Sequence, residues 1–232
     1  MLDYGTWWGG SREKYLEMQG VAKALGIKTS RVVLINYIFE FVTYCTSILA
    51  KQTDGTLIHL RMLDFGPPAQ LKNLTYVASF RKNGTELFKG VMFAGIPGSL
   101  FTAIKDGAFS ISINQRMTVG NSETDTKEFM ANLGMMAMGY NQPMRVIRDV
   151  METCPNFDCA LSQLSSQLMI SPCYIALTGT KNDEAVVITR NRTHTVNATY
   201  VSDDYWYLVQ TNDDTFAGKC RERCQAATKN LA

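Results

Sequence analysis

The stretch CTSILAKQTDGTLIHLRMLD, residues 45–64, decides the fold of this 232-residue chain. Apolar and β-branched side chains are frequent in its first seven and its last nine positions, and Asp54-Gly55 between them is a preferred hairpin turn. The stretch therefore predicts a strand, a tight turn and a second strand. Its first residue, Cys45, stands at the start of the first strand, directly after an apolar segment with helical spacing.

The flanking regions predict further helices and strands. Upstream, apolar residues at helical spacing predict a helix capped by Ser11 that stops at Gly26, and a second helix from Ser30 to about residue 41. Downstream, strands are predicted over residues 74–81, 86–93, 108–114, 173–179, 184–190 and 206–210. Helices are predicted between these two groups, over residues 127–138, 143–151 and 157–168. This order favours an α+β fold with packed layers of helix and antiparallel sheet.

Composition and charge limit the class of protein. Hydrophobic residues make up 46% of the chain and charged residues 19%, which suits one sizeable core and argues against disorder. Lys and Arg number 23 against 21 Asp and Glu, so charge-driven binding of nucleic acid is not expected. The longest apolar run, residues 32–44, is too short to cross a bilayer, although contact with a membrane surface stays open.

Cysteine and histidine usage bears on metals and disulfides. With two histidines and neither CxxC nor HExxH spacing, a zinc site is not expected, and no metal or organic cofactor is implied. If Cys45 is reserved for chemistry, five of the six cysteines remain. One of them is then either a buried thiol or the partner of a cysteine beyond residue 232.

Four glycosylation sequons bear on the compartment: they begin at Asn73, Asn83, Asn191 and Asn197. The start of the chain shows no charged segment followed by an apolar one, so no signal peptide is recognised. The sequons indicate a secretory-pathway protein, unless they are coincidental.

Cys45 is the strongest candidate for chemistry. A cysteine can use its own α-amine as a base, provided that the Tyr44–Cys45 bond is cut first. Candidate partners occur on the next strand and far downstream, at Arg61, Asp64, Asn114, Arg116 and Asn212. The alternative is that Cys45 is a buried strand thiol, that Arg61 and Asp64 form a structural ion pair, and that Asn212 caps a turn.

Strand geometry restricts how the first two partners act together. Residues three apart on a straight strand face opposite sides, so Arg61 and Asp64 share one site only if the strand bends or ends near Asp64, which Gly66-Pro67-Pro68 favours. His59, on the same strand, is expected to have no catalytic part.

Several segments, taken in order, resemble a known family. They are residues 45–50 (CTSILA), 54–66 (DGTLIHLRMLDFG), 93–95 (FAG), 107–116 (GAFSISINQR), 187–192 (VITRNR) and 209–212 (VQTN). From about residue 15 to the C-terminus the chain is similar to the acid ceramidase and N-acylethanolamine acid amidase family, with acid ceramidase as the nearer match. The resemblance implies an αββα N-terminal-nucleophile hydrolase sandwich with antiparallel sheets. It also implies a lysosomal glycoprotein that cuts itself before the cysteine and hydrolyses lipid amides.

The resemblance implies a role for each matching residue. Cys45 is the nucleophile and the new N-terminus, and Asp64 holds its α-ammonium group. Arg61 lies beside the nucleophile and orients substrate and amine. Asn212 donates to the oxyanion of the tetrahedral intermediate. Arg223 matches a family arginine loosely, within Cys220-Arg-Glu-Arg.

The resemblance also implies an organisation of the chain. Residues 1–44 form a helical N-terminal segment and residues 45–232 the catalytic segment, together one globular unit. Cleavage gives an α/β heterodimer in the lysosome or outside the cell. Its substrate is a lipid amide such as ceramide, and residues 30–44 are either core or a surface that contacts a membrane.

The chain departs from the family pattern in three places. Gln115 replaces a family glutamate and cannot act as a general base, so self-cleavage is expected to be slow or absent. The family reads Arg-Asn-X-Asp where this chain has Arg61-Met-Leu-Asp64. The family also continues past residue 232, so the chain is expected to be either a natural short form or a fragment that lacks part of a sheet. Two rivals therefore stay open: an N-acylethanolamine amidase of the same mechanism, and an uncleaved lipid-binding homologue.

Overall fold

The computed structural model describes residues 12–38, 44–64, 68–98, 100–116 and 122–231, and it begins with two helices. α2 (Arg12–Leu25) buries Met18 and Ala22, and it ends before Gly26, whose φ of 65° favours glycine. α3 (Thr29–Ile38) follows. Both predicted helices are confirmed, while the expected cap at Ser11 and residues 39–41 lie outside the described residues.

The hairpin predicted from residues 45–64 forms and belongs to a three-stranded antiparallel sheet. β1 (Tyr44–Lys51) pairs with β2 (Leu57–Asp64) on one side and with β10 (Tyr207–Gln210) on the other. At the turn, the Asp54 carboxylate accepts a hydrogen bond from the Thr56 amide at 2.8 Å. The register places Cys45 opposite Leu63.

The second sheet has seven antiparallel strands in chain order. They are β3 (Thr75–Lys82), β4 (Thr85–Phe93), β5 (Thr102–Lys105), β6 (Phe109–Gln115), β7 (Cys173–Thr178), β8 (Ala185–Arg190) and β9 (Thr195–Tyr200). Five of these strands were predicted from the sequence: β3, β4, β6, β7 and β8. β5 was missed because it has only four residues. β9 was missed because its half-exposed edge sequence, TVNATY, carries no apolar run.

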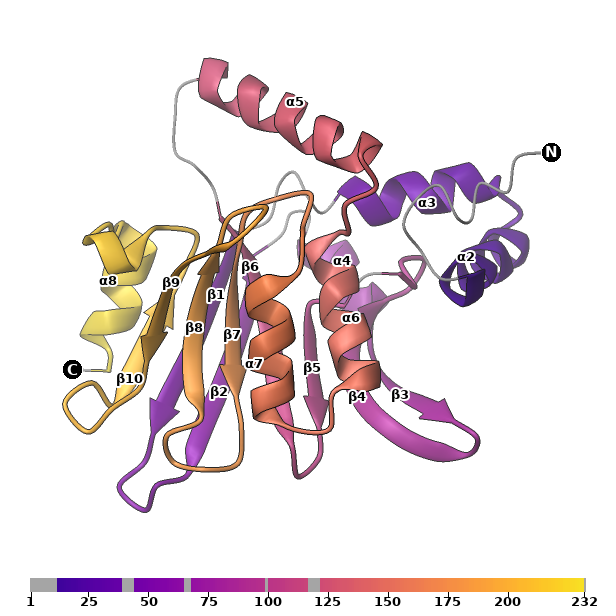
Figure 1. Ribbon diagram of the computed structural model, residues 1–232. Coiled ribbons are helices and arrows are strands. Elements are labelled where there is room, and N and C mark those ends of the chain that lie inside the picture. Colours follow the sequence, from indigo (N-terminus) through magenta and orange to yellow (C-terminus); the bar gives the residue numbers. More distant parts are fainter. Residues whose placement is uncertain (1–11, 39–43, 65–67, 99, 117–121, 232) are drawn as a thin grey trace.

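Helices and sheets stack in layers (Figure 1). α6 (Pro143–Thr153) and α7 (Phe157–Ser166) lie over one face of the seven-stranded sheet and form the larger core with it. The other face packs on the three-stranded sheet, where Leu49 of β1 contacts Tyr174 and Val187 in a second core. α8 (Glu222–Lys229) lies beside β10. The layer order confirms the predicted αββα sandwich.

The remaining elements join these layers. α4 (Pro68–Leu74) links the two sheets, α5 (Ser122–Ala137) precedes α6, and a single 3₁₀ turn (Thr215–Ala217) precedes α8. The three helices predicted between the strand groups are thus α5, α6 and α7. α4 and α8 were not predicted, because each has only seven or eight residues.

The N-terminal helices are anchored to α6 by charged and polar contacts. Lys14, which is buried, forms an ion pair with Asp149, and Arg148 binds the Glu17 carboxylate at 2.5 and 2.6 Å. The carbonyl of Asn36 accepts a hydrogen bond from the side chain of Gln142 at 3.1 Å. These contacts join residues 12–38 to the sandwich.

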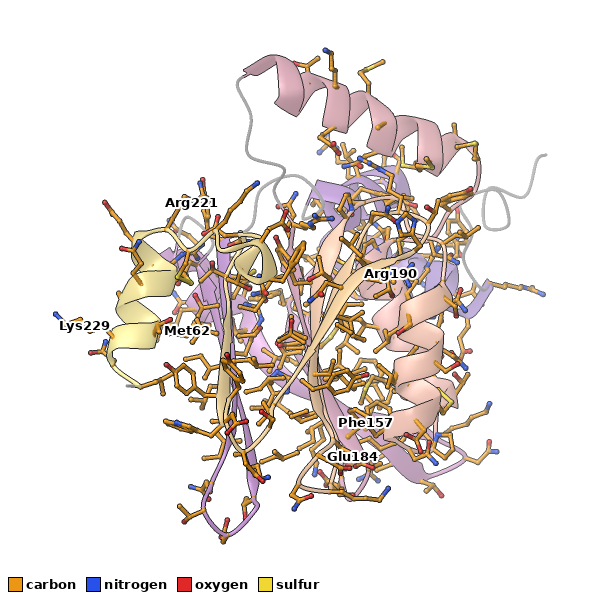
Figure 2. The ribbon with its side chains drawn as sticks, turned by 60° about the vertical axis from the view of Figure 1, so that its left-hand side comes forward. Met62, Phe157, Glu184, Arg190, Arg221 and Lys229 are labelled. Carbon is orange, nitrogen blue, oxygen red and sulfur yellow. A yellow bond between two sulfur atoms is a disulfide. The ribbon has the colours of Figure 1, made fainter. Side chains whose placement is uncertain are left out.

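The side-chain view shows how α7 is fixed to the sheet (Figure 2). Phe157 at the start of α7 and Glu184 just before β8 lie at one end of the seven-stranded sheet, and Arg190 lies toward the other end. Arg190 is fully buried and donates to the carbonyls of Leu164, at 2.8 Å, and Gln167. It thereby satisfies carbonyl groups at the C-terminal end of α7.

The disulfide pairing decides between the two alternatives that the sequence left for the fifth remaining cysteine, a buried thiol or a disulfide with a cysteine beyond residue 232. Disulfides join Cys154 to Cys159 and Cys220 to Cys224, and Cys45 and Cys173 are buried and form no disulfide. Cys173, which is outside both disulfides, is therefore the buried strand thiol of the two alternatives. None of the helices in the described part of the chain is long and apolar enough to span a bilayer.

The four sequon asparagines lie at or near the surface. Asn73 and Asn83 are exposed, and Asn191 and Asn197 are half-buried. Their glycosylation stays a prediction.

Candidate active site

The Cys45 thiol lies at the start of β1, and only 1% of the residue is exposed. One guanidinium nitrogen of Arg61, Nη2, donates to Cys45 Sγ at 2.9 Å and to the carbonyl of Ile113 at 2.7 Å. Strand pairing explains the contact, because Arg61 lies opposite Ser47, two residues along β1 from Cys45 and on the same face. A guanidinium in this place stabilises negative charge on the sulfur.

Asn212 is the second residue that the fold brings to Cys45, across 167 positions of sequence. It is completely buried. Its Oδ1 accepts hydrogen bonds from the backbone amide of Cys45 and from Arg223 Nη2, both at 2.8 Å. Its Nδ2 donates to the carbonyl of Gln115 at 2.7 Å. The Asn212 side chain therefore binds Cys45, and these contacts are not those of a turn cap.

Asp64 is the last residue of β2, which confirms the strand end expected there, and it lies on the face of the sheet opposite to Arg61. The pairing of β1 with β2 runs without a register shift up to Tyr44 and Asp64, so Asp64 faces away from Arg61. Its carboxylate accepts a hydrogen bond from Arg223 Nη1 at 2.9 Å. Gly66 and Pro67, where the bend was expected, lie outside the described residues.

Arg223 links the two faces of the site. It binds Asp64 through Nη1 and Asn212 through Nη2, and its guanidinium lies 5.2 Å from the centre of the Tyr44 ring. Asp64 is thus connected to the backbone amide of Cys45 through Arg223 and Asn212. The loosely matched Arg223 is therefore in direct contact with two of the candidate catalytic residues.

Asn114 is a positioning residue that the sequence analysis noted without a role. Its Nδ2 donates to the carbonyls of Gln210 and Thr211, at 2.7 and 3.2 Å, directly before Asn212. Its Oδ1 accepts from the hydroxyl of Ser47 at 2.9 Å. Asn114 thus joins the segment that carries Asn212 to the strand that carries Cys45.

Gln115, the last residue of β6, and Arg116, which follows it, both contact residues of the segment 212–214, but through different groups. The Gln115 carbonyl accepts from Asn212, as described above. Arg116 forms two hydrogen bonds with Asp214, at 2.7 and 2.9 Å, and this pair raises the pKa of Arg116 and lowers that of Asp214. Arg116 therefore helps to hold the segment 212–214 without contacting Cys45 in the described contacts.

His59 extends this polar network between the sheets. Its Nδ1 and Nε2 lie 2.8 Å from the hydroxyls of Ser110 and Ser112, and Ser112 lies 2.8 Å from Ser47. Burial, and secondarily the charge of Arg61, lowers the pKa of His59 from 6.5 to about 4.

The His59 pKa predicts a loss of stability in acid. The unfolded chain binds this proton near pH 6.5 and the folded chain near pH 4, so the stability from neutral His59 is present above pH 6.5 and lost as the pH falls through 4. At about 1.4 kcal/mol per pKa unit, about 3 kcal/mol is lost by pH 4. We expect His59→Asn to be less stable at pH 7 but to lose about 3 kcal/mol less than wild type between pH 7 and pH 4.

Urea unfolding at both pH values measures this difference. His194→Asn, in an exposed turn, is the matched control and should keep the wild-type pH dependence. Parallel pH curves for His59→Asn and wild type would contradict the assignment.

Two cavities share Arg61 as a lining residue. One, of about 290 Å³, is lined by apolar side chains that include Leu63, Leu71, Phe93 and Phe101. The other, of about 460 Å³, extends past His59. A larger cavity of about 720 Å³ lies between α2, α3 and α5 and is not lined by Cys45 or Arg61. Within the described residues no cluster of His, Cys, Asp and Glu is suited to a metal ion.

Two antiparallel sheets between helical layers, with a cysteine at the start of a central strand, define the fold of the N-terminal-nucleophile hydrolases. Tyr44 and Cys45 are consecutive residues of β1, so the structure describes the chain before any cleavage. No protein-family model matches the chain.

Comparison with known proteins identifies the family. The chain is 31% identical to bovine acid ceramidase, over 85% of this chain and 53% of the relative. It is 30% identical to the N-acylethanolamine-hydrolyzing acid amidase of Caenorhabditis elegans, over 97% of this chain and 67% of the relative. The solved structure of the Caenorhabditis elegans N-acylethanolamine-hydrolyzing acid amidase ortholog superposes with a TM-score of 0.69 at 32% identity, covering 81% of this chain and 80% of that one.

The chain therefore belongs to the acid ceramidase and N-acylethanolamine-hydrolyzing acid amidase family. It spans about half the length of the acid ceramidases that it matches.

Proposed function

We propose that this chain is a cysteine amidohydrolase that cleaves the N-acyl amide bond of a lipid. The observation that carries the proposal is the pair of contacts at Cys45, with Arg61 on the sulfur at 2.9 Å and Asn212 on the backbone nitrogen at 2.8 Å. The nucleophile, its charge stabiliser and an amide side chain thus meet at one residue. Membership of a family whose named relatives are lipid amidases supports the same chemistry.

Maturation is proposed to begin with Cys45 itself. Its thiolate attacks the carbonyl carbon of Tyr44, the C–N bond breaks, and the nitrogen takes up a proton and becomes the α-amine of Cys45. The resulting thioester is hydrolysed by water, which leaves a carboxylate on Tyr44 and restores the thiol. Asp64 lies opposite Tyr44 in the sheet, and its carboxylate is the proposed counter-charge for the new ammonium group.

Turnover is proposed to use the same atoms. The Cys45 thiolate attacks the acyl carbonyl, and Asn212 donates through Nδ2 to the oxyanion that forms. The α-amine delivers a proton to the leaving nitrogen, so that the amine departs and an acyl thioester remains. Water then attacks the thioester and releases the fatty acid.

The apolar cavity beside Arg61 supports an acyl chain as the bound group. Leu63, Leu71, Phe93 and Phe101 line it, and it offers about 290 Å³. We propose ceramide as the substrate, with fatty acid and sphingosine as products. An N-acylethanolamine is the second candidate, and the structural match to the nematode amidase, at a TM-score of 0.69, favours it.

The cleaved protein is proposed to stay together as an α/β heterodimer of residues 1–44 and 45–232, in a lysosome or outside the cell. The contacts of Lys14, Glu17 and Asn36 with α6 and its N-terminal flank support this, because they do not depend on the bond that is cut. Membrane contact through residues 30–44 is supported by Leu34 and Ile35, which α3 exposes by 65% and 37%. Residues 39–43 lie outside the described part of the chain.

A substrate panel tests this proposal. Wild-type protein is incubated at acidic pH with vesicles that contain either a ceramide or an N-acylethanolamine of the same acyl chain, and released fatty acid is measured. We expect release from ceramide to exceed release from the ethanolamide; the reverse order selects the second candidate. Absence of release from both, with vesicle binding retained, would identify a lipid-binding homologue in which Gln115 keeps the chain uncleaved.

The same vesicles test the membrane contact. Leu34→Ser is expected to weaken co-sedimentation of the protein with the vesicles, because the apolar side chain can no longer enter the lipid surface. Leu25→Ser, at an exposed position of α2, is the matched control, since Leu25 is 57% exposed and Leu34 is 65% exposed.

A further inference from the structure

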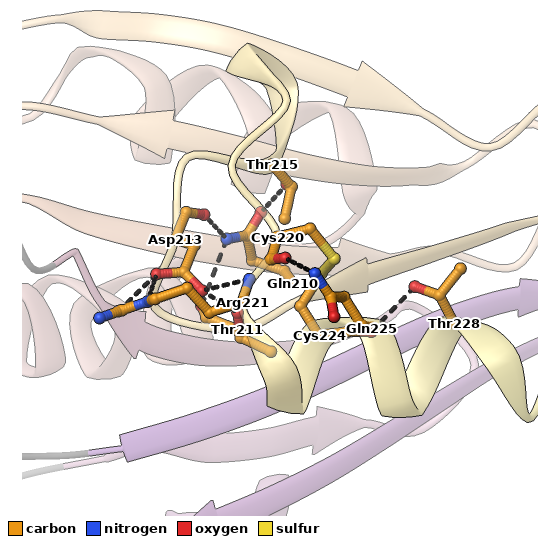
Figure 3. The surroundings of a disulfide bond; sticks show 9 residues. All are labelled: Gln210, Thr211, Asp213, Thr215, Cys220, Arg221, Cys224, Gln225 and Thr228. Atoms are coloured by element: carbon orange, nitrogen blue, oxygen red, sulfur yellow. Dashed lines mark hydrogen bonds and ion pairs between the residues drawn. A yellow bond between two sulfur atoms is a disulfide. The ribbon is translucent and has the colours of Figure 1, made fainter.

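A short disulfide loop contains two arginines that contact the candidate site, and Figure 3 shows one of them, Arg221, beside Asp213. Cys220 and Cys224 are joined across four positions, with a Cα–Cα distance of 5.2 Å, and Arg221 and Arg223 lie between them. We name residues 220–224 the strap. Cys224 belongs to α8 and is 2% exposed, whereas Cys220 lies just before the helix.

The two arginines of the strap bind successive residues of the segment that follows β10. Arg221 Nε donates to Asp213 Oδ1 at 2.6 Å, and the backbone amide of Arg221 lies 3.4 Å from Asp213 Oδ2. Arg223 donates to Asn212 Oδ1 at 2.8 Å. The orientation of the Asn212 side chain therefore depends on where the strap holds Arg223.

Apart from the polar contacts of its two arginines, which include that of Arg223 with Asp64, the strap is held by little apolar packing among the described residues. α8 has eight residues, a length at which an isolated helix is not stable, and Cys224 is its one buried residue. The Gln225 side chain donates to the Cys220 carbonyl at 2.8 Å, a contact inside the strap region that adds no link to the sheets. This weak packing leaves the backbone of residues 220–224 with conformational freedom. The disulfide restricts that freedom, because it covalently closes the loop that contains both arginines.

We propose that the Cys220–Cys224 disulfide positions Asn212 for catalysis and that its reduction inactivates the site. A dithiol or phosphine reductant supplies two electrons, the S–S bond breaks, and two thiols form with two protons from water. Arg221 and Arg223 then lose their fixed spacing, and Asn212 loses a partner that orients it. This inference rests on the proposed amidase function.

The test compares two disulfide-free variants of the full chain. Cys220→Ser/Cys224→Ser removes the strap, and Cys154→Ser/Cys159→Ser removes the disulfide between α6 and α7, on the far side of the seven-stranded sheet. We expect the strap variant to lose roughly 10- to 100-fold in kcat with KM within about twofold, because a small misplacement of a catalytic group acts on the transition state. The control variant should keep the wild-type kcat.

Hydrogen exchange supplies a readout that needs no activity. Backbone amides of residues 211–214 should exchange faster in the strap variant than in wild type, and at the wild-type rate in the control. Phosphine treatment of folded wild type should reproduce both effects and leave the strap variant unchanged, which covers the case in which that variant folds poorly.

The outcomes separate this inference from the proposed function. Unchanged exchange at residues 211–214 and unchanged kcat after loss of the strap would overturn the inference while the amidase proposal stands. Faster exchange in a protein that hydrolyses neither lipid amide would refute the amidase proposal and, with it, a catalytic role for the strap.

Discussion

Cys45→Ala is expected to remain a single polypeptide at acidic pH, whereas under the proposed function wild type is expected to separate, slowly because of Gln115, into residues 1–44 and 45–232. The variant lacks the sulfur that attacks the Tyr44 carbonyl, and no other described thiol or hydroxyl takes its place between Arg61 and Asn212. Lipid amide hydrolysis should fall by roughly 10³-fold or more, since loss of a nucleophile removes the covalent route. Denaturing gels and N-terminal sequencing of the larger fragment measure cleavage, and fatty-acid release measures turnover.

Cys173→Ala is the matched control, because Cys173 is the other buried cysteine that forms no disulfide. It lies on β7 with its sulfur 3.7 Å from Met169, away from the contacts of Cys45. This variant should cleave and turn over like wild type. A second band in Cys45→Ala that matches the wild-type fragment would show that another group cuts the chain.

Asn212→Asp is expected to lower kcat by roughly 10²- to 10³-fold with a small change in KM. The carboxylate keeps the acceptor atoms that bind the Cys45 amide and Arg223, but it has no hydrogen to donate to the oxyanion. It also faces the Gln115 carbonyl without a donor, so some loss of stability is expected. Steady-state kinetics and thermal unfolding separate the two effects.

Asn191→Asp is the matched control, because it makes the same amide-to-carboxylate change at a residue outside the candidate active site. Its Oδ1 accepts from the backbone amides of Thr193 and His194 within one turn, and a carboxylate can make both bonds. The control should retain wild-type kcat. If Asn212→Asp stayed within about threefold of wild type at full fold stability, the oxyanion role of Asn212 would be excluded.

The sequence predicts most of the fold because its strongest signals are local. The hairpin at residues 45–64 and the helices over α6 and α7 follow from turn residues and apolar spacing. The missed elements lack those signals: β5 and α8 are short, and β9 is half-exposed. One sequence pattern does indicate a helical turn near α8. Cys220 and Cys224 are four positions apart, a spacing that places two side chains on the same face of a helix.

The site was predictable in its residue types and less so in its geometry. Cys45 contacts both Arg61 and Asn212, although nothing local in the sequence shows that residue 212 reaches residue 45, and the catalytic roles of the three residues stay predictions. Asp64 lies at the strand end expected near it, and the alternation of β2 places it on the face opposite to Arg61, where Arg223 binds it. Asn114 acts through backbone carbonyls, and a pattern of side chains does not reveal such contacts.

The hydrogen bond from the Cys45 backbone amide to Asn212 Oδ1 exists while that nitrogen is still part of a peptide. In the proposed cleavage of the bond to Tyr44, the same nitrogen would become an amino terminus with an acceptor already 2.8 Å away. The uncleaved chain would in this respect be preorganised for its proposed product, because the acceptor need not be recruited afterwards. Activation would then consist of one severed bond in a framework that hardly needs to move.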